Sequence, residues 1–481
     1  MLKVLLIIVI SAVAVFGIIN YLLAILRVKK NNGGDADWLL VIIQTLITLL
    51  YLVPSALLFV ADLMLIVYPT AILGWLHFGW VIALTVVLAL VGIVINIVLF
   101  RQGQDGYYDD EDNPFMSRIG HRSIASILIC VVSVVIMIIG LSTLGGKTLV
   151  IDNQKQINVI RNIPNPDKAN YVLNTDIDCG ITGSKWFGEL QNYYGVFDGN
   201  YHTIKNISVN ISNAGDYGMV INNHGTIKNL CITDAQIRQS GEKYAYDVDL
   251  ATLGTICGIN SGTIENCRVI DTFLWRDTGY RGGFTYIGGI VGLNDNGTIK
   301  HCEFVNETSN EKYDYSIYME SEHSQIGSGT FGVCAGTICG QSDGGVIENC
   351  FAGPSTTHTH IESSVGTPLQ ATGGIVGRAI GDFELKNVIS VSECTGSRNR
   401  TLVYSGHKYE GSLIAYGNGE GEILNSYAFG VDVSIIGDGK TSTYDVSTLV
   451  SNKFKVEELS KDFSSWSDTN QGYPTPCLGY N

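Results

Sequence analysis

Proline and charged side chains are scarce in this sequence: 9 of 481 residues are proline and 16% are charged. It contains no Walker loop and no H-E-x-x-H or C-x-x-C motif. These absences argue against P-loop nucleotide hydrolases, zinc proteases and dithiol oxidoreductases. Glycine is abundant at 55 residues, and 24 tyrosines outnumber 16 phenylalanines. Such a composition fits short strands joined by many turns better than a helical enzyme.

Positive charge is also in deficit, and the deficit is uneven. Residues 1–146 hold seven Lys and Arg against eight Asp and Glu, a net charge of −1. Residues 147–481 hold 23 against 37, a net charge of −14. An acidic surface repels phosphate, so we expect no nucleic-acid partner for the second half.

A unit of strand, turn and strand recurs in the second half. Its clearest copy is GGIVGLNDNGTIKHCEFV, Gly288–Val305, and further copies begin at Tyr217, Leu253, Ala335, Gly373 and Ser412. The residues that precede the last strand of each copy are Leu230, Cys267, Cys302, Cys350, Val388 and Ser426, at intervals of 37, 35, 48, 38 and 38 residues. Self-similarity at such a period is typical of a solenoid, in which each unit buries its apolar face against its neighbours. The sequence therefore predicts a parallel β-helix.

Alternation within the last strand of each unit predicts which side chains face inward. The expected inward pairs are Cys267 with Val269, Cys302 with Phe304, Cys350 with Ala352, and Val388 with Ser390. Their neighbours Arg268, Glu303 and Phe351 are expected to face solvent. A charge reversal at Glu303 is accordingly predicted to be nearly silent.

At these residues the chain resembles bacterial proteins that carry the GLUG motif, which is named for a Gly-Leu-any-Gly core. The matching segments are Gly289-Ile290-Val291-Gly292 and Gly374-Ile375-Val376-Gly377, and residues 171–178 and 197–204 are similar to the leader before such repeats. The resemblance covers about residues 151–480. It implies a right-handed β-helix on an adhesin-like bacterial surface protein, and it implies no single activity.

The first 146 residues contain four long apolar segments: 2–26, 38–64, 74–100 and 123–144. About 20 apolar residues are enough for a helix to cross roughly 30 Å of hydrocarbon. The sequence therefore predicts an N-terminal α-helical membrane bundle of four spans, residues 1–146, whose partner is the lipid bilayer.

Lys and Arg gather in the loops 27–37 and 101–122, whereas the link around Pro69 has none. The positive-inside rule then predicts a multi-pass protein of the plasma membrane with its C-terminal domain extracellular. Asp62 is the only ionisable residue well inside an apolar segment. It is either a functional intramembrane carboxylate or a residue at the outer interface.

The rest of the chain divides into a connector with leader coils (147–210), β-helix repeats (211–440) and a C-terminal cap (441–481). Two insertions, Asp271–Tyr286 and Asn306–Val333, are rich in tyrosine and acids: Tyr280, Tyr286, Tyr313, Tyr315, Tyr318, Glu320 and Glu322. Loops on a rigid solenoid often bind ligands. The insertions are therefore either the site for an extracellular glycan or protein, with tyrosines that stack on sugar rings, or padding along the side of the helix.

Eleven cysteines invite a disulfide interpretation, which the repeat phase opposes. Cys257 and Cys339 occupy equivalent positions in two repeats that are not adjacent. About two coil spacings, roughly 10 Å, therefore separate them, which is too far for a disulfide. Cys267, Cys302 and Cys350 stack with parallel Cβ directions, which fits a disulfide poorly. We expect a ladder of free thiols. The state of five others stays open: Cys179, Cys231, Cys334, Cys394 and Cys477.

Candidate chemistry is sparse. His358 and His360 share one face of a strand and could bind a metal with Glu362; the alternative is a polar pair without a ligand. Acidic residues recur singly, as Glu265 and Glu348 do, without the close pair that polysaccharide hydrolysis uses. We assign no catalytic, cofactor-binding or metal-binding residue.

The predicted function is therefore that of a membrane-anchored, surface-exposed β-helix binding or adhesin-like protein. The alternatives are a structural envelope protein and a polysaccharide-acting β-helix enzyme.

Overall fold

The structure of the protein is a computed structural model. It describes residues 148–157, 160, 165–180, 190–213, 215–240, 250–278, 283–306, 315–323, 331–363, 369–398, 407–419, 421–429, 436–440, 443–449, 455–469, 473–477 and 479–480. Nearly all of them belong to one compact unit, Thr148–Arg161 with Pro166–Asn481.

The predicted fold class, with a helical membrane bundle as its first half, is corrected by the structure. The described part of the chain is dominated by parallel β-strands. Its helices are short, and none of those described has the length and apolar character of a membrane span. The four predicted spans, 2–26, 38–64, 74–100 and 123–144, and Asp62 lie outside the described residues. Hydropathy measures only the preference of a segment for apolar surroundings, and it does not specify a packed helical architecture.

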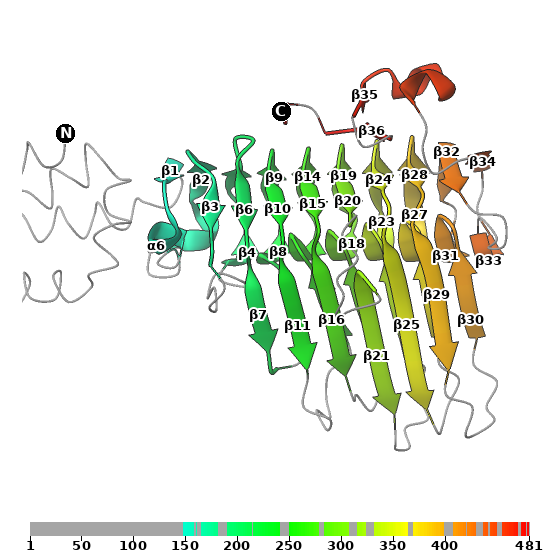
Figure 1. Cartoon of the computed structure of the whole chain (residues 1–481). Helices are drawn as coiled ribbons and strands as arrows, with labels where there is room; N and C mark the ends of the chain where they lie inside the picture. Colours follow the sequence, from blue (N-terminus) through cyan, green and yellow to red (C-terminus); the bar gives the residue numbers. More distant parts are fainter. Residues whose placement is uncertain are drawn as a thin grey trace, which may run out of the picture. The chain divides into compact units, whose positions relative to one another are not determined.

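The strands form a solenoid whose coils pass through three parallel sheets (Figure 1). One coil runs through β12 (Leu250–Gly254), β13 (Cys257–Asn260), β14 (Thr263–Glu265), β15 (Arg268–Ile270) and β16 (Phe273–Thr278). We call the sheet of β16 sheet B and the sheet of β12 sheet C; β13, β14 and β15 belong to the large sheet A. Each strand pairs in parallel with its counterpart one coil further on, as a β-helix requires.

Sheet A consists of three rows of strands. The first row contains β4 (Leu190–Tyr193), β8 (Val220–Asn223), β13, β18 (Val291–Asp295), β23 (Cys339–Glu348), β27 (Val376–Lys386), β31 (Ile414–Asn418) and β33 (Ile436–Lys440). The second contains β1 (Thr148–Ile151), β2 (Asn170–Leu173), β5 (Val196–Asp198), β9 (Thr226–Lys228), β14, β19 (Thr298–Lys300), the ends of β23 and β27, β32 (Glu422–Phe429) and β34 (Thr443–Leu449). The third contains β3 (Ile177–Asp178), β6 (Thr203–Lys205), β10 (Cys231–Thr233), β15, β20 (Glu303–Val305), β24 (Phe351–Ala352) and β28 (Ile389–Ser390), and it continues through the ends of β32 and β34.

Sheet B has the order β29-β25-β21-β16-β11-β7, and sheet C has the order β12-β17-β22-β26-β30. The remaining strands of sheet B are β7 (Ser208–Ile211), β11 (Gln236–Ser240), β21 (Ile317–His323), β25 (Thr356–Ser363) and β29 (Glu393–Arg398). Those of sheet C are β17 (Gly283–Gly288), β22 (Phe331–Gly336), β26 (Leu369–Gly373) and β30 (His407–Gly411). The helix α6 (Gln154–Ile157) and the short η2 (Pro166–Lys168) lie near the first coils.

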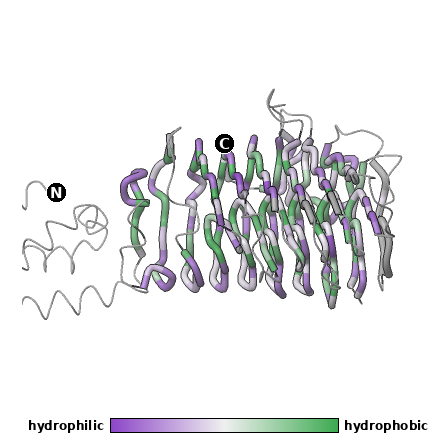
Figure 2. The backbone as a smooth tube through the Cα atoms, turned by 90° about the horizontal axis from the view of Figure 1, so that it is seen from below, coloured by the Kyte–Doolittle hydropathy of each residue, from purple (hydrophilic) through white to green (hydrophobic). Residues whose placement is uncertain are grey.

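The predicted register is confirmed. Arg268 pairs with Glu303 and Glu303 with Phe351, which places Cys267, Cys302 and Cys350 on successive coils. These cysteines, and the other side chains expected to face inward, are buried. The coils lie side by side, and each passes through hydrophobic and hydrophilic stretches in turn (Figure 2).

An asparagine recurs immediately before the inward-facing position. Asn229, Asn266, Asn349, Asn387 and Asn425 all have φ between 46° and 53°, in the left-handed region that asparagine tolerates. Asn266 donates to Asn229 at 2.9 Å and Asn387 donates to Asn349 at 3.2 Å, so neighbouring turns are linked. The repeated E-N-C and K-N sequences therefore encode a stacked turn between the second and third strands of each coil.

A second asparagine ladder lies inside the solenoid. Asn223 donates to Asn260 at 2.8 Å, and Asn260 donates to Asn294 at 2.9 Å. All three side chains are fully buried. Because a buried amide without partners costs stability, the ladder fixes the turn between the first and second strands of each coil.

The outer face of the second row carries charges of alternating sign. Successive coils present Asp198, Lys228, Glu265, Lys300, Glu348 and Lys386 at one position. Ion pairs join Lys228 to Asp198 at 3.4 Å and Lys300 to Glu265 at 3.1 Å. Because these side chains are partly exposed, each pair adds little stability. If a coil paired with the next coil but one, like charges would lie side by side. The alternation of sign therefore also helps to specify which coils pair.

The C-terminal residues lie along the outer side of the third row (Figure 1). They comprise η3 (Val456–Glu458), η4 (Lys461–Phe463) and the antiparallel pair β35 (Ser467–Asp468) and β36 (Pro474–Thr475). Phe463, Trp466 and Tyr473 pack on an outward apolar strip formed by Val305, Phe351, Ile389 and Val391. We call residues 455–480 the C-terminal strap.

The strap overturns the prediction that Arg268, Glu303 and Phe351 face solvent. These side chains do point away from the solenoid interior, but Glu303 is 1% exposed and Phe351 is 0% exposed. The Glu303 carboxylate pairs with Arg268 and accepts a hydrogen bond from Thr475 Oγ1. Alternation gives the direction of a side chain, but it cannot tell that a distant segment covers it.

Candidate functional site

The outer face of sheet B carries a row of aromatic and polar side chains that crosses five coils. Register places Arg238 beside Trp275, Trp275 beside Tyr318, Tyr318 beside His358, and His358 beside Thr395. Their strand neighbours Ile237, Leu274 and Ile317 are buried, so alternation directs this row away from the core. We call these five residues the aromatic row.

The rings of the aromatic row lie over one another. The Arg238 guanidinium lies 4.6 Å from the centre of the Trp275 ring. The ring centroids of Trp275 and Tyr318 are 6.4 Å apart, and those of Tyr318 and His358 are 5.7 Å apart with planes 6° from parallel. Tyr315 also stacks on His358 at 4.3 Å. Because the ring faces contact each other, this surface offers ring edges and polar ends rather than open faces for sugar stacking.

A second outward row runs parallel to the first and consists of Ser240, Asp277, Glu320, His360 and Ser397. We call it the polar row. It places Asp277 and Glu320 as direct register partners on adjacent strands, which are about 4.8 Å apart. Tyr318 donates its hydroxyl to Glu320 Oε2 at 3.3 Å. Burial, followed by the negative charge of Glu320, raises the pKa of Tyr318 well above its usual value.

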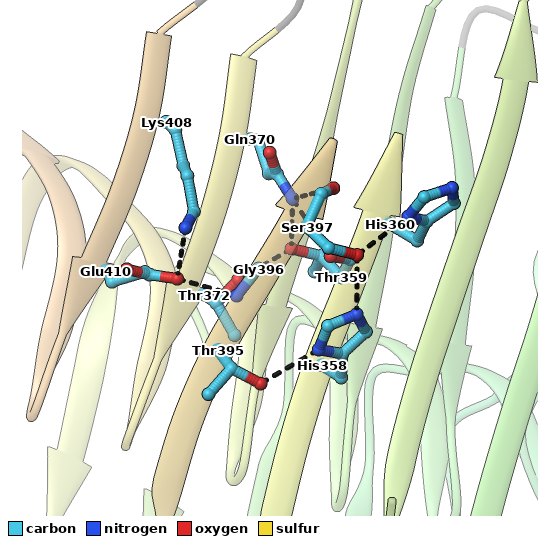
Figure 3. A network of polar contacts seen from close by, with 10 residues as sticks. All are labelled: His358, Thr359, His360, Gln370, Thr372, Thr395, Gly396, Ser397, Lys408 and Glu410. Carbon is cyan, nitrogen blue, oxygen red and sulfur yellow. Dashed lines mark hydrogen bonds and ion pairs between the residues drawn. The ribbon is translucent and has the colours of Figure 1, made fainter. Parts of the chain in front are cut away.

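Two imidazoles converge on the Ser397 hydroxyl at the C-terminal end of these rows (Figure 3). His358 Nε2 lies 3.0 Å and His360 Nδ1 lies 2.7 Å from Ser397 Oγ. His358 Nδ1 lies 2.8 Å from Thr395 Oγ1. Burial, with smaller contributions from the charges of His360 and Lys408, lowers the pKa of His358 to about 4. The His358 ring is therefore neutral near pH 7 and has one N–H to donate.

Buried polar groups between sheets B and C support this end of the site (Figure 3). The Gln370 amide donates to the Thr359 carbonyl at 2.9 Å and to the Ser397 carbonyl at 3.2 Å. The hydroxyls of Thr359 and Thr372 lie 2.7 Å apart. Glu410 accepts a hydrogen bond from the Gly396 backbone N–H at 2.6 Å and pairs with Lys408 at 2.8 Å. Strand β29, which bears Ser397, is thereby held on both sides.

The predicted metal ligands only partly come together. His358 and His360 share the outer face of β25, but both contact hydroxyls, and the side chain of Glu362 lies outside the described set. Within the described residues, no group of three His, Cys, Asp or Glu side chains is arranged to hold a metal ion.

The described parts of the two predicted insertions consist mainly of regular strands. Asp271–Tyr286 contains β16 and most of β17, and Asn306–Val333 contains β21 and the start of β22. Tyr286 is buried, whereas Tyr315 and Tyr318 belong to the stack on sheet B. Tyr280 and Tyr313, and the side chain of Glu322, lie outside the described residues. The repeat was recognised by its glycines: each strand of sheet C ends on one of them, whereas β16 and β21 of sheet B contain none.

Sequence reasoning named Glu320 as an acidic residue of an insertion but missed that Asp277 is its neighbour. It also missed Arg238, Trp275 and Ser397. The alternating pattern of two segments could have revealed Trp275 and the two carboxylates. These segments are FLWRDT, the sequence of β16, and IYMESEH, the sequence of β21. Aligning these two segments as strands places tryptophan beside tyrosine and aspartate beside glutamate.

The predicted thiol ladder is confirmed in the described part of the chain. Ten cysteines are buried there and form no disulfide with one another, including all five whose state was left open. Burial raises the pKa of Cys334, Cys339 and Cys394 to about 12 in each case. These thiols are therefore protonated at neutral pH and behave as small apolar side chains.

Comparison with known proteins gives limited similarity. No protein-family model matches the chain. A segment of 112 residues, 23% of this chain, is 34% identical to Halomucin of Haloquadratum walsbyi (strain DSM 16790 / HBSQ001). The matched segment is 1% of the length of Halomucin, so the likeness is confined to a small part of that protein.

Proposed function

We propose that this chain is a cell-surface binding protein whose parallel β-solenoid presents a ligand-binding surface on the outer face of sheet B. The observation that carries the proposal is the pair of parallel rows, aromatic and polar, that runs across five successive coils. Solenoids commonly use such extended surfaces to bind long ligands.

The chemistry of the rows favours a hydroxyl-rich ligand. The carboxylates of Asp277 and Glu320 accept hydrogen bonds, whereas the indole of Trp275 and the hydroxyl of Ser397 can donate them. Outward side chains follow one another about every 4.8 Å along the solenoid axis, which suits a linear polymer lying parallel to that axis. We therefore infer an extracellular glycan as the ligand, and a protein is the alternative.

Location at the surface is part of the same proposal. The apolar composition of residues 1–146 and the placement of Lys and Arg there favour attachment at the plasma membrane, with the solenoid outside the cell. The resemblance to GLUG-motif surface proteins and the local similarity to Halomucin are compatible with this location.

A second candidate function is polysaccharide hydrolysis, and one observation favours it. Asp277 and Glu320 lie on adjacent strands, and retaining glycosidases use carboxyl groups about 5–5.5 Å apart. In this role one carboxyl group would attack the sugar and the other would transfer the proton.

The test uses the full chain, purified in detergent, on an array of glycans and proteins. The key variants are Trp275→Ala and Glu320→Gln, and the matched control is Glu265→Gln on the outer face of sheet A. We expect binding of a glycan that both sheet B variants weaken at least tenfold and the control leaves unchanged.

Analysis of the bound glycan for new reducing ends separates the two functions. Retention without cleavage supports a binding protein, and cleavage abolished by Glu320→Gln supports the hydrolase. Binding that survives both sheet B variants contradicts the proposed surface.

A further inference from the structure

A second apolar cluster lies where the outer face of sheet C meets the first row of sheet A. Its buried members are Tyr286, Leu293, Cys334, Ala371 and Ala415, and its partly buried members are Leu250, Ile259, Phe284, Leu369, Tyr409 and Tyr416. Between these positions, Ile287 and Ala335 alternate toward the solenoid interior. The cluster is therefore on the outside of the coils, and we call it the corner.

Short side chains occupy the middle of the corner. One row runs from Tyr286 through Cys334 and Ala371 to Tyr409. The next row runs from Phe284 through Gly332 to Leu369. A Cβ on Gly332 would lie 2.8 Å from the Phe284 ring, so the ring occupies the space that a larger residue would fill. The middle of the corner thus lies between aromatic residues that are three coils apart.

Arg378 lies across this middle part. Its guanidinium is 4.8 Å from the centre of the Phe284 ring and 6.0 Å from the centre of the Tyr416 ring. It donates from Nη1 to the Gln341 side chain at 3.0 Å, and its Nε is buried without a hydrogen-bond partner. Among the described residues, no carboxylate forms an ion pair with it.

An arginine without a carboxylate partner is notable in a region of the chain with a net charge of −14. Taking a guanidinium partly out of water is costly unless an anion or good hydrogen bonds compensate for it. The two aromatic rings provide part of the compensation through cation–π contacts. The planar guanidinium remains well suited to a carboxylate, which it binds with two parallel hydrogen bonds.

We propose that the corner is a subsite for a carboxylated sugar, a uronic acid residue, whose carboxylate binds Arg378. The rings of Phe284 and Tyr416 would contact the apolar edges of the sugar, and the Gln341 amide would bind a sugar hydroxyl. This subsite lies on different sheets from the two rows of sheet B, and it does not depend on the function proposed for them.

The test is titration of the full chain in detergent with trigalacturonate at low ionic strength, followed by calorimetry. The methyl ester of the same trisaccharide is the matched ligand, because it keeps the shape of the sugar and removes its charge. We expect measurable binding of the acid form, at least tenfold weaker binding of the methyl ester, and the same loss in Arg378→Gln. Lys300→Gln, which removes a cation from the charge row on the second row of sheet A, outside both proposed surfaces, should bind as the unaltered protein does.

Two further arms make the result decisive. Arg378→Lys keeps the charge without the planar fork, and we expect intermediate affinity. Sodium acetate at the same concentration should not displace the trisaccharide. The proposal is overturned if the acid form does not bind, if ester and acid bind equally, if acetate displaces the sugar, or if a folded Arg378→Gln variant retains full affinity.

Discussion

Glu303 accepts a hydrogen bond from Thr475, a residue 172 positions further along the chain, and the contact lies beneath the C-terminal strap. The same carboxylate pairs with Arg268 on the preceding coil. The strap is fixed further along by Cys477, whose thiol donates to the His301 carbonyl at 3.1 Å, and by Tyr480, whose hydroxyl donates to the Asn266 carbonyl at 3.0 Å. The strap therefore joins the last described coils to coils formed by much earlier residues.

The first prediction concerns this buried carboxylate. Glu303→Lys places a second cation beside Arg268 in a site that is 1% exposed, so we expect a loss of about 3–5 kcal/mol in the free energy of unfolding. Denaturant unfolding of the full chain, monitored by tryptophan fluorescence, measures this loss. Glu348→Lys, on the partly exposed charge row of sheet A, should change stability by less than about 1 kcal/mol. Equal effects would show that the strap does not cover Glu303 in solution.

The second prediction concerns the thiol ladder. Cys302 is fully buried between Cys267 and Cys350, so Cys302→Asp introduces a charge without a partner into the interior. We expect a loss of several kcal/mol, on the order of 3 kcal/mol or more. Cys302→Ala removes only the sulfur and should cost clearly less, and the difference between the two variants measures the charge. A stable Cys302→Asp variant would contradict the inward register.

A feature could be predicted from the sequence when it depends on residues close together in the chain, and not when it depends on residues far apart. The stacking of Cys267, Cys302 and Cys350 could be predicted because each repeat encodes its own turn and alternation. Strands β16 and β21 of sheet B were taken for insertions, since Trp275 and Tyr318 occur in segments without the glycine motif. Burial of Glu303 could not be predicted, because it depends on Thr475 folding back across several coils. The neighbouring carboxylates of the candidate site became visible only when the register of β16 and β21 was known.

The third prediction concerns pH. Burial lowers the pKa of His358 from 6.5 to about 4 in the folded protein. The unfolded chain therefore takes up a proton below about pH 6.5, whereas the folded protein resists protonation until about pH 4. The contribution of this histidine to stability is present above pH 6.5 and is lost as the pH falls toward 4. We expect the unfolding free energy of His358→Gln to fall less over this interval than that of the unaltered chain.

His202→Gln is the control for this pH prediction. His202 is more exposed and lies in a leader coil, where its ring contacts Asp176 at 3.1 Å. If the two variants and the unaltered chain all lose stability in parallel between pH 6.5 and 4, then His358 is not the group responsible.

The last prediction concerns the packing of the strap. Trp466 is 4% exposed and contacts the Phe351 and Phe463 rings edge to face, at centroid distances of 6.1 and 5.1 Å. Trp466→Ala should therefore cost about 3–5 kcal/mol if the strap unfolds together with the solenoid. If the strap instead detaches first, the cost will be smaller, and the apolar strip around Val305 and Ile389 will become exposed and bind a hydrophobic dye. Measuring unfolding and dye binding on the same samples separates these cases, with Trp275→Ala on the outer face of sheet B as the matched tryptophan control. A Trp466→Ala variant that keeps full stability and binds no dye would contradict the packing of the strap on the solenoid.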